Sequence, residues 1–154
     1  MLFRSYANDD AHRLEQTGRA WNVVRAADRS PAAIAEALRS GSFYASCGVT
    51  IDRIECDGPI LSLHAPDAQR IQVIGPSGVR LRFVDAPELR LDAGELDASY
   101  IRIECLGAGG AAAWTQPFTK LWLNKNLPLR IKLQNFLSAN MASLSVQLIW
   151  TILT

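Results

Sequence analysis

The sequence lacks the features that mark several large classes of protein. Three cysteines among 154 residues, none in CxxC spacing, favour neither a disulfide framework nor a thiolate zinc site. The N-terminal stretch MLFRSYANDDAH has no long apolar run and already carries acidic residues, so it does not resemble a secretory signal peptide. We therefore expect a cytoplasmic protein.

An excess of positive charge is also missing. Sixteen Lys and Arg against fifteen Asp and Glu give a net charge of +1, which argues against a general nucleic-acid binder. No G-x-S-x-G nucleophile motif occurs, and the glycine-rich residues 107–110 are not followed by the Lys-Ser/Thr of a phosphate-binding loop. They predict a hairpin turn instead. The composition, 49% hydrophobic and 20% charged, is that of a globular protein with a sizeable core.

One helix is clearly indicated, over residues 31–39. Ser30 is a suitable N-cap, Pro31 stands where its missing N–H costs nothing, and Gly41 is a suitable stop. Ile34 and Leu38 lie four residues apart and predict a narrow apolar stripe along this helix.

After this helix the hydrophobic period changes from 3.6 to 2. Short alternating segments separated by turn signals predict an antiparallel β-sandwich, immunoglobulin-like, over residues 43–118. Two of its shorter strands are expected at Val49–Ile54 and Ile60–His64. The side chains expected to face the core of the sandwich are Ile71, Val73, Val79, Leu81, Phe83, Ile101 and Ile103.

The sharpest candidate for chemistry is the stretch from Asn8 to His12. In an extended strand, Asp10 and His12 would point to the same side, and Asp9 to the other. A carboxylate and an imidazole are suitable ligands for zinc, manganese or iron. The alternative is that Asp9 or Asp10 caps a turn or helix and that His12 is a surface histidine. His64 is expected to be a strand-edge histidine rather than a ligand.

Cys56 and Cys105 stand where they can face each other across the sandwich. In a cytoplasmic protein, a buried and reduced pair is the better interpretation.

Several short stretches occur in an order that resembles a known family, the PHP-domain (polymerase and histidinol phosphatase) proteins, which are metal-dependent phosphoesterases. The resemblance is to the C-terminal part of these proteins and covers about residues 5–118. The stretches that carry it are Asn8–His12, Gly18–Trp21, Val23–Ala26, Ser30–Ile34, Gly41–Ser46, Tyr100–Cys105 and Ala113–Phe118.

The resemblance implies a fold and an activity. The catalytic part of the family is a distorted β/α barrel that holds a cluster of divalent metals, here manganese, zinc or iron, and cleaves phosphoester substrates. Its final metal-binding motif, Asp-x-His, corresponds to Asp10 and His12. Residues 1–42 would then be the last strand and helix of the barrel, and residues 43–118 the sandwich that follows it in this subgroup.

The family also opens with a His-x-His motif and has further His and acidic ligands, which this sequence lacks. We therefore expect a truncated chain, a C-terminal fragment that is inactive alone. The alternative is a non-catalytic β-sandwich that serves as a binding or interaction module. Without the rest of the barrel, an apolar surface made of Trp21, Val23 and the helix stripe would be exposed. Such a surface favours self-association or binding to the missing barrel half.

Residues 119–154 contain no acidic residue, and residues 136–154 carry no charge at all. That length would span a bilayer, but serine, asparagine and glutamine dilute its apolarity, so a membrane span is the least favoured reading. The other two are a segment that docks on the sandwich or a partner, and a tail produced by a frameshift.

Overall fold

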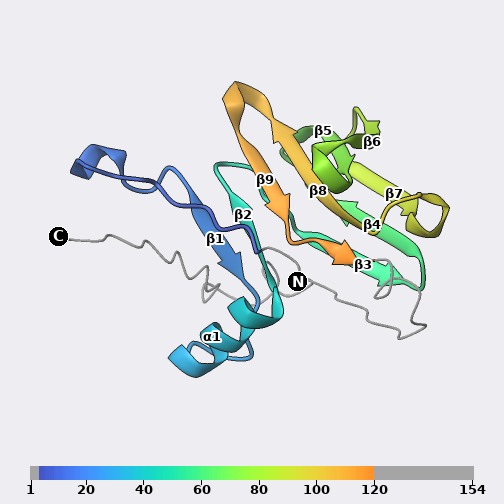
Figure 1. The fold of residues 1–154 in the computed structure, drawn as a ribbon. Coiled ribbons are helices and arrows are strands. Elements are labelled where there is room, and N and C mark those ends of the chain that lie inside the picture. Colours follow the sequence, from blue (N-terminus) through green and yellow to red (C-terminus); the bar gives the residue numbers. More distant parts are fainter. Residues whose placement is uncertain (1–3, 120–154) are drawn as a thin grey trace.

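The structure is a computed structural model that describes residues 4–119 of the chain (Figure 1). It contains one α-helix, ten strands and several single turns of 3-10 helix within these residues. The strands are β1 (Trp21–Val24), β2 (Phe43–Ser46), β3 (Arg53–Asp57), β4 (Ile60–His64), β5 (Ala68–Ile74), β6 (Arg80–Val84), β7 (Glu88–Asp92), β8 (Tyr100–Gly107), β9 (Ala112–Thr115) and β10 (Phe118–Thr119), and the helix is α1 (Pro31–Ser40).

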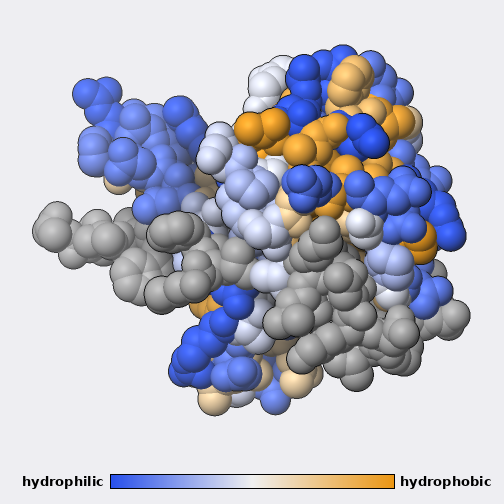
Figure 2. All heavy atoms as spheres, turned by 45° about the vertical axis from the view of Figure 1, so that its right-hand side comes forward, coloured by the Kyte–Doolittle hydropathy of each residue, from blue (hydrophilic) through white to orange (hydrophobic). Residues whose placement is uncertain are grey.

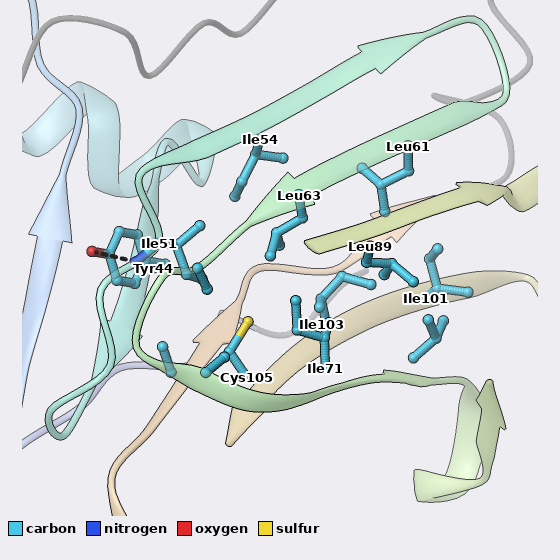
Figure 3. Close-up of a cluster of buried hydrophobic side chains, with 14 of the residues drawn as sticks. Tyr44, Ile51, Ile54, Leu61, Leu63, Ile71, Leu89, Ile101, Ile103 and Cys105 are labelled. Atoms are coloured by element: carbon cyan, nitrogen blue, oxygen red, sulfur yellow. Dashed lines mark hydrogen bonds between the residues drawn. The ribbon is translucent and has the colours of Figure 1, made fainter. Parts of the chain in front are cut away.

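The strands form two antiparallel sheets. The larger sheet has the order β1-β2-β9-β8-β5-β6, with β10 also paired to β8, and the smaller sheet has the order β3-β4-β7. Residues from both sheets contribute to one buried hydrophobic cluster (Figure 3). The fold is therefore mainly β and sandwich-like, as the alternating hydrophobic pattern predicts.

The core follows the period-2 pattern most closely in β8 and β4. Ile101, Ile103 and Cys105 on β8 are buried, and so are Leu61 and Leu63 on β4 (Figure 3). Complete burial of a leucine or isoleucine side chain stabilises a fold by about 1.5–3 kcal/mol. These residues of the two sheets therefore form the centre of the core.

The predicted helix is confirmed as α1. The Ser30 hydroxyl accepts a hydrogen bond from the Ala33 N–H at 3.2 Å, and Gly41 ends the helix with a φ of 82°. A left-handed backbone of this kind is accessible to glycine at little cost. Of the expected apolar stripe, Ala37 is buried, whereas Ile34 and Leu38 are half-buried.

The strand expected at Val49–Ile54 is present but its bounds are wrong, because β3 begins only at Arg53 and extends to Asp57. Val49 and Ile51 are nevertheless buried, in the connection that leads from the larger sheet to the smaller one. The Tyr44 hydroxyl accepts a hydrogen bond from the Ile51 N–H at 3.2 Å (Figure 3). The apolar pattern here reflects a buried connection in which the Ile51 N–H bonds to a side chain instead of to a neighbouring strand.

Two of the residues expected in the core, Val79 and Phe83, are instead 56% and 52% exposed. The other five face the core, although Leu81 is only partly buried. Hydrophobic surface is visible beside hydrophilic surface on the side of the molecule where β6 lies (Figure 2). The expectation of strict alternation from residue 79 to residue 83 was therefore wrong at both ends.

A register shift between β5 and β6 explains the outward position of Phe83. The pairing shifts between Val73 and Ile74, so that Leu81 and Val84 pack against the core. Such an irregularity interrupts the alternation of side chains along a strand. Phe83 pairs with a polar residue of β5, and the guanidinium carbons of two arginines lie 4.8 and 5.3 Å from its ring centre.

Strand β1 pairs with β2 in an antiparallel arrangement, so the larger sheet extends across the expected boundary between residues 42 and 43. The division into domains stays a prediction. The expectations for the apolar tail fall on residues 120–154, which lie outside the described part of the chain. Within residues 4–119, the structure contains no helix long and apolar enough to cross a membrane.

Candidate functional site

The residues singled out for chemistry lie in a segment that precedes β1. Residues 8–20, called the arm here, run outward from the sheet, form the short 3-10 helix Leu14–Gln16 and return to the start of β1 (Figure 1). The arm carries both Asp10 and His12.

Asp10 and His12 do not lie in a strand, which corrects the expected extended conformation. Asp10 has a φ of 49°, and its N–H donates a hydrogen bond to the Asn8 side-chain oxygen at 2.8 Å. Asparagine is well suited to such a turn, because its side chain bonds to the backbone two residues later. Both Asp10 and His12 are exposed.

Asp9 closes the base of the arm. Its carboxylate accepts hydrogen bonds from the backbone N–H groups of Gly18 at 2.7 Å, Arg19 at 2.6 Å and Ala20 at 2.5 Å. These backbone bonds, from Ala20 and Gly18 first, lower the pKa of Asp9. The alternative in which Asp9 caps a turn is therefore confirmed, and Asp9 is a structural residue of the arm.

Gln16 fixes the middle of the arm in a similar way. Its side-chain oxygen accepts hydrogen bonds from the N–H groups of His12 at 2.8 Å and Arg13 at 3.0 Å. Asn8, Asp9 and Gln16 thus use their side chains to hold the backbone on either side of His12. By contrast, the side chains of Asp10 and His12 make no hydrogen bond or ion pair within residues 4–119.

The sequence pattern indicates Asp9 as a candidate cap but not its partners, which lie 9 to 11 residues later. It predicts no role for Gln16. The signal that would have helped is the capping arrangement around the short helix, since a glutamine at its third position can bond back to the residue before it.

As a metal site, the arm is incomplete. A carboxylate and an imidazole suit zinc, manganese or iron, but a catalytic metal site usually has three protein ligands. The described residues contain no group of three or more His, Cys, Asp or Glu side chains that could hold a metal ion. Asp10 and His12 are therefore two residues of suitable chemistry on one arm, without a third candidate ligand grouped with them in residues 4–119.

The other candidate ligands are either bonded to another side chain or buried. His64 lies at the end of β4, and its Nδ1 is 2.8 Å from the Oδ1 of Asp52. Cys56 and Cys105 are free and buried, and burial raises the pKa of each thiol to about 12. Metals bind the thiolate form, so both cysteines are poor ligands, as expected for a buried, reduced pair.

Comparison with known proteins supports the resemblance in one part of the chain. Residues 4–43 match the sequence model of a family described as PHP-associated. The match contains the arm, β1 and α1, and ends at the first residue of β2. No curated protein and no solved structure matches the chain. The resemblance to a PHP-associated region is thus supported for residues 4–43, the segment that holds Asp10 and His12.

Proposed function

We propose that the arm supplies Asp10 and His12 as two ligands of a PHP-type divalent-metal centre whose other ligands lie outside residues 4–119. One observation carries this proposal. Three neighbouring polar side chains, those of Asn8, Asp9 and Gln16, hold the backbone of the arm, while Asp10 and His12 are exposed and unengaged within these residues. The match of residues 4–43 to the PHP-associated family supports it.

In this proposal the function of the complete centre is phosphoester hydrolysis. When bound, the metals polarise the phosphoester and lower the pKa of a bound water. The part of Asp10 and His12 is to hold the metal from one side, and the part of the sandwich is to support the arm. Two ligands do not fix a coordination geometry, so we expect the chain alone to bind divalent metal weakly and to be catalytically inactive.

Hydrolysis of 4-nitrophenyl phosphate by the purified full chain, with manganese or zinc present, tests this function. We expect no turnover above the metal-only background. Turnover that disappears in both Asp10→Asn and His12→Ala would show that the chain, alone or as a dimer, completes the site, and would overturn the proposal of an inactive chain.

A second candidate function is a non-catalytic module that binds a partner protein. Leu14, at the start of the short helix in the arm, is 85% exposed, so its apolar side chain is available for contact with a partner. This function requires neither Asp10 nor His12. Metal binding that is lost in His12→Ala favours the first proposal, and its complete absence in the wild type favours the second.

A further inference from the structure

Two buried amide side chains connect the start of the described chain to the larger sheet. Asn22 lies on β1 and Gln116 follows β9, and they are only 8% and 5% exposed. Buried amides are costly unless their donors and acceptors find partners. In this fold, both partners are backbone groups of the segment that leads into the arm.

Each amide both accepts a hydrogen bond from the backbone of one residue in this segment and donates one to it. The Ser5 N–H donates to the Gln116 Oε1 at 3.0 Å, and the Gln116 Nε2 donates to the Ser5 carbonyl at 2.8 Å. The Ala7 N–H donates to the Asn22 Oδ1 at 2.9 Å, and the Asn22 Nδ2 donates to the Ala7 carbonyl at 2.9 Å. Four hydrogen bonds thus hold a segment that belongs to no strand.

The spacing of these contacts defines the orientation of the segment. Ser5 and Ala7 are two residues apart, and the residue between them, Tyr6, stacks on the ring of Phe43 with ring centres 4.8 Å apart. The amides therefore take the place of a neighbouring strand, since each offers one donor and one acceptor to one residue. An apolar contact alone would hold the segment without fixing its register.

The segment continues directly into the arm, because Asn8 follows Ala7. We infer that Asn22 and Gln116 are positioning residues of the candidate site, which fix the base of the arm on the sheet so that Asp10 and His12 are presented in one place. The link to a metal rests on the proposed function, whereas the attachment of the segment does not.

This inference extends the site beyond the segment that matches the PHP-associated family. Gln116 lies far outside residues 4–43 and is 111 positions from its partner Ser5. A residue that follows a strand of the sandwich therefore supports the arm directly. The sandwich is then a part of the site's construction and not merely a neighbour of it.

The test compares Asn22→Ala and Gln116→Ala with Gln72→Ala, measured by amide hydrogen exchange on the full chain. Gln72 is a matched control, because its amide donates to Glu104 at 2.7 Å on the same sheet, whereas Ser5 and Ala7 bond to the two other amides. We expect exchange at Ser5 in Gln116→Ala, and at Ala7 in Asn22→Ala, to accelerate about tenfold, with core amides unchanged. Unchanged exchange at both would overturn the inference.

A second readout separates positioning from a merely structural role. Manganese affinity, measured by the loss of the free-ion EPR signal, should fall about tenfold in both variants at unchanged core protection, and stay constant in Gln72→Ala. Faster exchange with unchanged manganese affinity would overturn the positioning role. If the wild type binds no manganese, the proposed function fails, while the exchange result still decides whether the amides attach the segment.

Asn22→Asp and Gln116→Glu serve where an alanine variant does not fold. Each keeps the acceptor oxygen and shape of the amide and replaces its donor by an oxygen. We expect these two variants to accelerate exchange less than the alanine variants, and no acceleration in any folded variant would contradict the inference.

Discussion

Replacement of Tyr44 on β2 by phenylalanine removes the hydroxyl that bonds to the connection between the two sheets. That oxygen accepts the hydrogen bond of the Ile51 N–H at 3.2 Å, and both residues are buried, with exposed fractions of 5% and 3%. Without it the N–H has no partner, and a buried unsatisfied donor costs about 1–3 kcal/mol. We expect Tyr44→Phe to lower the free energy of unfolding by this amount, or the melting temperature by roughly 3–9 °C.

Tyr6→Phe is the matched control, because it deletes the same atom from a side chain that is 55% exposed. The ring of Tyr6 can still stack on Phe43, so its effect should stay within about 0.5 kcal/mol. Urea unfolding followed by tryptophan fluorescence measures both variants, and an unchanged m-value would confirm that the same transition is compared. Equal stabilities of the two variants would refute the argument that the Tyr44 hydroxyl satisfies the buried N–H of Ile51.

Two further predictions concern ionisation. Cys47 is partly exposed, whereas Cys56 and Cys105 are buried and each has a pKa of about 12. Ellman's reagent should therefore modify the Cys47 thiol quickly and the other two thiols only after unfolding. Rapid reaction of all three thiols would contradict the burial of Cys56 and Cys105. Because its backbone bonds lower the pKa of Asp9, its contribution to stability is present above the unfolded value of 3.8 and is lost as the pH falls through the lower folded value. The NMR shift of the Gly18 amide should follow this titration in the wild type and not in Asp9→Asn, and identical titration curves would contradict the assignment.

Local signals were sufficient to predict some elements. Ser30, Pro31 and Gly41 define both ends of α1 by interactions within a few residues, and the helix lies where they indicate. The alternation in β8 is equally local, because each of its core residues faces the same way along one regular strand. These features depend little on the rest of the chain.

Features that depend on distant partners could not be predicted in the same way. Phe83 faces outward because the pairing of β6 with β5 shifts, and the sequence of β6 alone does not predict such a shift. Val49 and Ile51 have the composition of a strand, yet their backbone lies in a buried connection. Burial and strand pairing give the same apolar signal in a single sequence.

The candidate site was predicted in part. The spacing of Asp10 and His12 indicates them as candidates, but the extended strand that it predicts is wrong, because Asp10 has a left-handed backbone. Asn22 and Gln116 cannot be identified from the sequence, because a single amide has no periodic or motif signal and their partners lie 15 and 111 residues away. Such contacts emerge only from the fold.

The most direct test of the account is a titration of the full chain with Mn²⁺, followed by EPR, for the wild type, His12→Ala and His64→Ala. His64 is the matched control, since its ring is bonded to Asp52 on the sandwich. The account predicts weak binding by the wild type and by His64→Ala, and none by His12→Ala. Equal binding by all three proteins, or loss in His64→Ala alone, would contradict the claim that the arm presents Asp10 and His12 to a metal.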